Sequence, residues 1–174
     1  MIFVIQIPPS KSEELIQRLK EVPFIKDAFS PLKKKKIKLR GYWETREVRL
    51  FPDYIFVECD DPKDVYQKLK DFSFFTKLLG VRDKKDKELY FIPLSEDEEA
   101  FLNHLMGKDN REVIGISKVM LLKNKQITII DGPLYGMEGF VTKVDPHKQL
   151  VYVSLQLLGR DTTVALSVDL IKEL

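Results

Sequence analysis

The last third of the chain constrains the fold most, because it breaks into short β-branched segments separated by turn residues. About five strand-like segments fit into roughly 55 residues, a spacing that indicates a small β-barrel. These segments are VMLLKNKQITIID, GFVTKVD, LVYVSLQLL, TTVAL and DLIKEL. Val and Thr favour strands, and glycines would weaken helices, so we expect this part of the chain to be entirely β.

A glycine-rich stretch, TIIDGPLYGMEGFVTKVD, lies inside this region, and we expect it to contain the loop between the first two barrel strands. The three glycines allow positive φ angles or close backbone approach, and the proline fixes the start of the loop. From the residues alone, the stretch is either a tight hairpin or a loop that presents a surface. The candidate residues of this loop are Gly132, Pro133, Tyr135, Gly136, Met137 and Gly139.

The region before the barrel predicts an α+β domain. The apolar run IFVIQI, ended by two prolines, is typical of a buried strand. Three capping signals mark helix starts: Ser10 with Glu13, Asp61 with Pro62, and Ser95 with Glu98. Short strands are expected around a charged turn, RDKKDKE. We therefore predict an α+β domain at residues 1–106, a linker without clear periodicity at 107–118, and the barrel at 119–174.

A basic segment, Lys33 to Arg49, carries eight cations and two acids, a local net charge of +6. It predicts two strands that meet at a turn around residues 40 and 41, with Tyr42 and Trp43 at that turn. Because side chains alternate along a strand, every second cation of the first strand shares one face. Two interpretations stay open. The cations could follow a phosphate backbone while the rings stack a base, or the lysines could keep an edge strand soluble.

The stretch RLFPDYIFVECD places three large aromatic residues before and within a strand. Tyr54 and Phe56 lie on one face of that strand, Ile55 lies on the other, and Phe51 comes just before. If the Ile55 face packs on helices, the aromatic face is exposed and marks a partner site. The alternative is a central strand that is buried on both faces.

Composition narrows the classes of function. Hydrophobic residues make up 44% of the chain, enough for a packed core, and the formal net charge is only +2. With one cysteine, Cys59, and two histidines, His104 and His147, neither a zinc site nor a Cys/His dyad is indicated. Phosphate-binding and nucleophile-elbow motifs are absent from the sequence, so we expect no enzyme, no metal and no cofactor. The lone cysteine and the lack of a signal-peptide pattern or a long apolar run predict a cytoplasmic protein without a membrane segment.

Two motifs resemble a known family. RLFPDYIFVE closely resembles the Leu-Phe-Pro-Gly-Tyr-hydrophobic-Phe-Val signature of the NusG amino-terminal (NGN) domain. IIDGPLYGMEGFVTKVD, followed by VYVSLQLLGRDTTVAL, resembles the KOW motif of the same family. Their order and spacing extend the resemblance over essentially the whole chain. The resemblance implies an α+β fold: an NGN domain with an antiparallel sheet flanked by helices, a linker, and a small SH3-like KOW barrel, in a monomer.

The resemblance also implies a role in transcription without catalysis. NusG-like factors place an apolar depression of the NGN domain on the clamp region of RNA polymerase and suppress pausing. By position, the docking residues here would be Phe51, Tyr54 and Phe56, with Phe3 on the first strand. The KOW loops would contact RNA or proteins, among them a ribosomal protein or a termination factor, with Tyr135 and Met137 as candidate contacts that could instead fold into the core.

Departures from the family pattern suggest a specialised member. Ile2 and Phe3 replace the usual Trp-Tyr, and Asp53 replaces the usual Gly after Phe-Pro. With the basic segment, these changes look most similar to the LoaP antiterminators, which an RNA hairpin recruits, whereas DNA recruits the RfaH type. A housekeeping NusG-like factor and a ribosome-associated KOW protein are the alternatives. The candidate nucleic-acid-binding residues are Lys33, Lys34, Lys35, Lys36, Lys38, Arg40, Tyr42, Arg46, Arg49, Lys118, Lys123 and Lys125.

Overall fold

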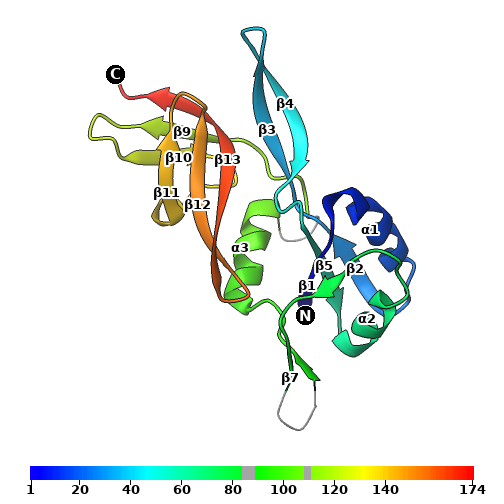
Figure 1. Ribbon diagram of the computed structural model, residues 1–174. Coiled ribbons are helices and arrows are strands. Elements are labelled where there is room, and N and C mark those ends of the chain that lie inside the picture. Colours follow the sequence, from blue (N-terminus) through cyan, green and yellow to red (C-terminus); the bar gives the residue numbers. More distant parts are fainter. Residues whose placement is uncertain (84–88, 108–110) are drawn as a thin grey trace. The chain divides into compact units, whose positions relative to one another are not determined.

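The structure is a computed structural model that describes residues 1–83, 89–107 and 111–174 (Figure 1). Its contacts divide the chain into two compact units. Unit 1 comprises Met1–Ser30 and Phe51–Glu99, and unit 2 comprises Pro31–Leu50 and Ala100–Leu174. The basic segment therefore groups with the C-terminal strands, although the predicted domain boundaries place it in the first domain.

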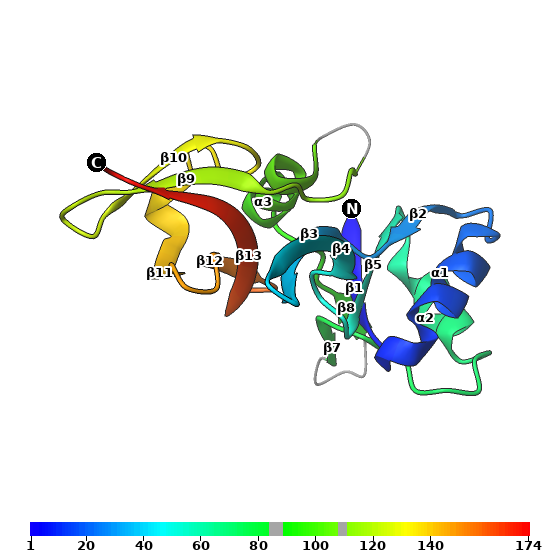
Figure 2. The same cartoon turned by 90° about the horizontal axis from the view of Figure 1, so that it is seen from above.

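Unit 1 is built on a four-stranded antiparallel sheet. In spatial order its strands are β2 (Ile25–Phe29), β5 (Tyr54–Cys59), β1 (Ile2–Gln6) and β6 (Lys77–Leu78). The 3₁₀ turn η1 (Pro9–Lys11) leads into helix α1 (Ser12–Lys20), and α2 (Pro62–Leu69) follows β5. Both helices lie on the same face of the sheet (Figure 2).

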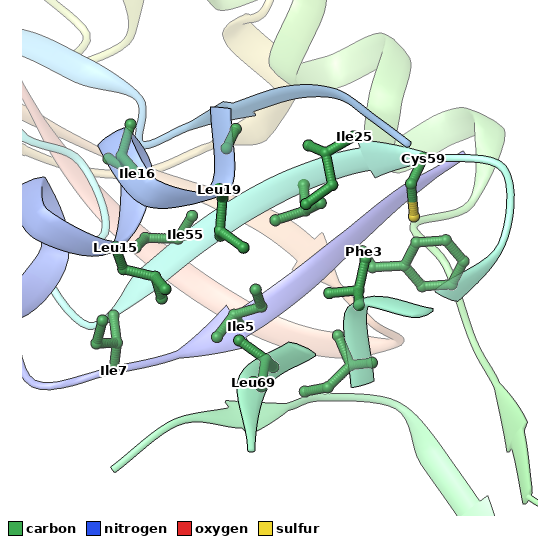
Figure 3. Close-up of a cluster of buried hydrophobic side chains, with 14 of the residues drawn as sticks. Phe3, Ile5, Ile7, Leu15, Ile16, Leu19, Ile25, Ile55, Cys59 and Leu69 are labelled. Carbon is green, nitrogen blue, oxygen red and sulfur yellow. The ribbon is translucent and has the colours of Figure 1, made fainter. Parts of the chain in front are cut away.

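The core of unit 1 lies between this sheet face and the two helices (Figure 3). Leu15 and Leu19 are one helical turn apart on α1, and both are fully buried. Strand alternation sends Ile5 of β1 and Ile55 of β5, which are ladder partners, to the same face. Apolar residues that repeat every 3.6 positions on the helix and every second position on the strands therefore meet in one apolar layer.

Two of the three predicted capping signals are confirmed. The Asp61 side chain accepts from the Lys63 backbone N–H at 2.9 Å, with Pro62 as the first residue of α2. Ser95 and Glu98 form a reciprocal box at 2.9 and 3.2 Å at the start of helix α3 (Glu96–Met106). The box predicted at Ser10 is wrong, because η1 occupies that stretch and α1 begins at Ser12 without a side-chain cap.

A short ribbon precedes α3, formed by β7 (Val81–Asp83) and β8 (Leu89–Phe91). The charged turn predicted around residues 82–88 lies mostly outside the described residues. The predicted linker is also described only in part, without residues 108–110. Within it, Ile114 is buried and forms a parallel bridge with Lys33.

The C-terminal part of unit 2 is a five-stranded sheet, which agrees with the predicted number of strands but not with their predicted limits. VMLLKNKQITIID forms two strands, whereas TTVAL and most of DLIKEL belong to one long strand, Arg160–Lys172. In spatial order its strands are β10 (Ile127–Asp131), β9 (Ser117–Leu121), β13 (Arg160–Lys172), β12 (Leu150–Leu157) and β11 (Val141–Asp145). Only the β13–β9 pair is parallel. Alternate residues of β12, from Val151 to Leu157, are buried, which is the period of a strand with one face in a core. The α+β fold with a small terminal β domain is confirmed.

Unit 2 also contains the predicted basic hairpin, formed by β3 (Leu32–Leu39) and β4 (Tyr42–Arg49) (Figure 1). Its two-residue turn has positive φ at both positions, 50° at Arg40 and 84° at Gly41. That geometry suits the twist of a two-residue β-hairpin. The position predicted for the turn is confirmed.

Candidate nucleic-acid interface and aromatic cluster

An aromatic cluster of Phe29, Phe51, Tyr54 and Phe56 lies on the face of the unit 1 sheet opposite α1 and α2. Phe56 is the ladder partner of Phe29 on β2. Ring centroids are 5.6 Å apart for Phe29 and Phe56, 5.7 Å for Phe51 and Phe56, and 6.3 Å for Phe51 and Tyr54. These spacings are typical of favourable aromatic pairs, so the rings support one another.

The predicted exposure of this face is wrong for two of its members. Phe51 is 5% exposed and Phe56 is 0% exposed, whereas Tyr54 is only partly buried. The Phe56 ring contacts the rings of Phe29 and Phe51, a packing that sequence alternation alone does not reveal. Sequence reasoning also missed Phe29, although the alternation of Ala28 and Phe29 along β2 could have indicated it.

Phe3 does not belong to this cluster. It is paired with Val57, and both side chains lie in the core beneath the helices. Phe56 pairs with Val4 and therefore points to the other face of the sheet. Phe3 and Phe56 therefore lie on opposite faces of the sheet. This corrects the prediction that Phe3 shares a docking face with the aromatic residues of β5.

Cross-strand pairing divides the hairpin side chains between two faces. Lys34, Lys36 and Lys38 share one face, as predicted, and Trp43 of β4 lies opposite Lys38 on that face. Arg40, predicted on the same face, lies instead in the turn with positive φ. The Trp43 ring centroid is 5.0 Å from the Lys36 ammonium and 5.8 Å from that of Lys38, both within cation–π range. Trp43 is one of the two rings that the sequence indicated for stacking a base, although the candidate nucleic-acid-binding residues included only Tyr42.

Two of the predicted nucleic-acid-binding lysines are engaged within unit 2. The Lys33 ammonium donates to the Ala165 carbonyl of β13 at 2.6 Å. The Lys36 ammonium forms an ion pair with Asp169 at 2.8 Å and donates to Gln149, and only 10% of its side chain is exposed. Burial, with a smaller effect of a neighbouring lysine, lowers the pKa of Lys33 from its ordinary value of 10.5. Neither lysine is therefore free to bind a phosphate, although both were predicted to do so together with the other cations of the hairpin.

The remaining candidates on the hairpin are more accessible. The exposed cations are Lys34, Lys35, Lys38, Arg40 and Arg46, while Arg49 is partly buried. Arg46 lies 3.6 Å from Glu44, so part of its charge is compensated. Tyr42, at the turn, is 76% exposed and lies opposite Leu39.

The three predicted lysines of the C-terminal sheet belong to β9 and the turn after it. Lys118 is exposed and pairs across the sheet with Asp131 on one side and Asp169 on the other. Lys123 and Lys125 lie in the β9–β10 turn, and both are exposed. Lys125 also lines an open pocket of about 810 Å³ between β10 and β11, with Ile127, Val141 and Lys143 among the other lining residues.

The glycine-rich loop connects β10 to β11, and not the first two strands, because VMLLKNKQITIID alone forms the β9–β10 hairpin. Gly132 has φ 100°, and a Cβ there would lie 2.6 Å from the Ser117 Cα atom. Gly136 also has positive φ. Gly139 has neither a positive φ nor a close neighbour, so the prediction that a glycine is needed there is wrong. The two candidate contact residues separate, as Tyr135 is 63% exposed and Met137 only 5%. Met137 therefore packs inward.

The described residues show no cluster of three or more His, Cys, Asp or Glu side chains that could hold a metal ion. In the same part of the chain, no helix has the length and apolar character needed to cross a membrane. The features of interest are thus a basic hairpin, an aromatic cluster and a glycine-rich loop.

Comparison with known proteins decides the family. The family model described as "Transcription termination factor nusG" matches residues 2–101, more than half of the chain. The chain belongs to the NusG family. The predicted resemblance is confirmed at that level, and the narrower likeness to LoaP-type antiterminators stays a prediction. NusG-family proteins are transcription factors and not enzymes.

Curated relatives agree with this assignment. The chain is 24% identical to the transcription termination/antitermination protein NusG of Thermus thermophilus over 131 residues, covering 72% of this chain and 68% of the relative. It is 25% identical to the Bacillus subtilis protein of the same name over 126 residues, covering 72% and 67%. A solved structure described as "Domain interaction in Thermotoga maritima NusG" has a TM-score of 0.52 at 16% identity, covering 97% of this chain and 93% of that one. This likeness supports the NusG fold along nearly the whole chain.

Proposed function

We propose that this NusG-family protein is a processive antitermination factor that binds the clamp region of RNA polymerase through its first domain and is recruited by a leader-RNA hairpin. The observation that carries the recruitment is the β3–β4 hairpin, with its local net charge of +6 and its exposed Tyr42. Cations along a two-stranded ribbon suit a phosphate backbone. The aromatic cluster is the candidate polymerase contact, and Tyr54 is its more accessible member.

The glycine-rich loop adds a second candidate contact surface. Tyr135 projects into solvent from a loop whose backbone is fixed at Gly132. An exposed ring on a fixed loop suits binding to RNA or to a protein. We propose this surface for a ribosomal protein or a termination factor.

Polymerase binding can be tested by titrating the full chain against core RNA polymerase. Tyr54→Ala should weaken binding by about tenfold, because a truncated aromatic contact at an interface typically costs more than 1 kcal/mol. Phe75→Ala is the matched control, since Phe75 is a 60% exposed ring of unit 1 outside the aromatic cluster. Phe51 and Phe56 are unsuitable, because truncating a buried ring costs about 3–5 kcal/mol of stability.

Two outcomes would overturn this part of the proposal. Absence of polymerase binding by the wild-type chain would leave an RNA-binding, ribosome-associated protein as the better assignment. Equal weakening by Tyr54→Ala and Phe75→Ala would remove the aromatic cluster from the interface.

A housekeeping NusG-like elongation factor is the second candidate function, favoured by the sequence likeness to NusG proteins over 72% of this chain. The two roles differ in their requirement for a recruiting signal. A housekeeping factor should change pausing on any template in a purified transcription reaction. A recruited factor should act only on templates whose transcript contains the signal.

A further inference from the structure

The cations of the β3–β4 hairpin differ in their availability. Lys33 and Lys36 are held by acceptors on β13. Lys38 and Arg40, nearer the tip, are exposed, and neither has a carboxylate partner in the part of the chain that the structure describes. Lys34 and Lys35, farther from the tip, are exposed as well, so uncompensated positive charge extends along the hairpin as far as its tip.

Trp43 lies among these cations. Its side chain is opposite Lys38 in the ladder, and the residue is 38% exposed. Lys36, 5.0 Å from the ring centroid, is itself fixed by Asp169, Gln149 and the Val168 carbonyl. The ring thus has an ordered neighbour, which lowers the entropy lost when a ligand orders the site.

Tyr42 lies on the opposite face of the hairpin, also at the tip. It is 76% exposed, and its ladder partner is Leu39, which is 40% exposed. Both faces of the tip therefore present an accessible aromatic ring within a few residues of an uncompensated cation.

Accessible rings beside free cations match one class of nucleic-acid ligand. Bases stack on aromatic rings only when their faces are uncovered, as in single strands, bulges and loops. In a duplex the neighbouring base pairs cover those faces, and its sequence is read through base edges by hydrogen-bonding side chains. The tip carries two accessible rings beside Lys38 and Arg40, so it can stack uncovered bases as well as bind the adjoining phosphates.

We infer that the tip of the β3–β4 hairpin binds unpaired nucleotides, with one base stacked on Trp43 and the adjoining phosphates on Lys38 and Arg40. The inference rests on the proposed recruitment by nucleic acid. It adds that the hairpin binds the unpaired nucleotides of that nucleic acid. The unpaired nucleotides can belong to a single strand or to the loop of an RNA hairpin. Tyr42 stacks a second base on the other face of the tip.

The chain itself provides the probe, because Trp43 is its only tryptophan. The full-length protein is titrated with a single-stranded RNA of about ten nucleotides, a length within the range of known single-strand sites. The same sequence in a blunt duplex and in the loop of a hairpin serves for comparison. We expect saturable quenching of Trp43 emission by the single strand and by the loop, and at least about tenfold weaker binding of the duplex.

Variants separate stacking from charge. Trp43→Ala, followed by anisotropy of a labelled strand, should weaken binding by about tenfold. Lys38→Gln should weaken binding less than Trp43→Ala does. It should also reduce the slope of log affinity against log salt concentration by about one, because one fewer counterion is released on binding. Phe75→Ala is the control, because it removes an exposed ring that lies outside the hairpin and outside the surfaces proposed to bind nucleic acid. Trp43→Phe, which keeps a ring, should retain most of the affinity and shows that a loss in Trp43→Ala is not due to misfolding.

Several results would overturn the inference. Duplex binding as tight as single-strand binding would assign the hairpin to groove or backbone recognition. Binding without any change in Trp43 emission would place the nucleotides elsewhere. No binding of any nucleic acid would leave an acidic protein as the partner of the tip. Because polymerase binding is measured separately through Tyr54, failure here is distinguishable from failure of the proposed polymerase contact.

Discussion

At the scale of the residue, Gly132 shows how one backbone position organises the glycine-rich loop. The Leu134 N–H donates to the Ser117 hydroxyl at 2.9 Å, and this buried bond joins the loop to the start of β9. Gly132 lies against the same residue, so closely that a Cβ would come within 2.6 Å of the Ser117 Cα. Its φ of 100° is also outside the range that other residues readily adopt.

Gly132→Ala should therefore lower the free energy of unfolding by about 3 kcal/mol or more, through backbone strain and steric overlap. Gly136→Ala should cost about 1 kcal/mol, since only its positive φ opposes a side chain. Gly139→Ala should stay within about 0.5 kcal/mol, because nothing lies within 4 Å of its added Cβ. Denaturant unfolding followed by circular dichroism measures all three, and equal losses at Gly132 and Gly139 would contradict the steric argument.

At the scale of the element, the basic hairpin is attached to β13 by polar contacts along the edge of β3. The Lys36 N–H donates to the Ser167 hydroxyl at 3.0 Å, and its ammonium reaches Asp169. A backbone donor of an edge strand is thereby satisfied, which removes part of an exposed edge. Asp169 meanwhile neutralises one of the hairpin's cations.

Asp169→Asn should increase the affinity for nucleic acid at low salt, because the Lys36 charge is no longer compensated. The expected gain is about threefold to tenfold, with a steeper salt dependence. The cost in stability should be within about 1 kcal/mol, since Asp169 is 61% exposed and such ion pairs contribute little. Titration of a labelled strand at several salt concentrations measures both quantities.

Asp161→Asn is the matched control for this experiment. It makes the same charge change on β13, but Asp161 bonds to Gln156 and not to the hairpin. An equal gain in both variants would mean that overall charge, and not release of Lys36, determines the affinity.

At the scale of the whole molecule, the chain divides into two units that interrupt each other in sequence. Unit 1 consists of segments that precede and follow the hairpin in the sequence. Unit 2 contains the hairpin and the C-terminal strands. This grouping predicts which parts lose structure together, since contacts within a unit are denser than contacts across units.

Hydrogen exchange of the Gly132→Ala variant tests the grouping. Destabilising the C-terminal sheet should speed amide exchange in β9 to β13 and in the β3–β4 hairpin. The amides of β1 and β5 should keep the protection that they have in the wild-type chain. Hairpin amides that retain their protection while the C-terminal strands lose theirs would show that the hairpin is stabilised independently of them.

The elements of this fold follow in large part from local sequence. The turn at Gly41, the cap at Asp61 and the box at Ser95 were predictable, because each depends on residues within a few positions of one another. The all-β character of the C-terminal region was predictable from β-branched segments and turn signals, but the limits of its strands were not, since β9 and β10 share one predicted segment and β13 spans two. The box at Ser10 failed because a 3₁₀ turn competes for the same short stretch.

The candidate site depended on tertiary structure to a much greater degree. The sequence alone determined that the hairpin is strongly basic and that aromatic residues surround Tyr54 and Trp43. Only the tertiary structure decided that Phe56 is buried, that Phe3 lies on the opposite sheet face, and that Lys33 reaches a carbonyl 132 residues away in the sequence. The physical reason is that local periodicity determines the direction of a side chain along its own element, whereas exposure and charge compensation depend on distant segments that pack against it.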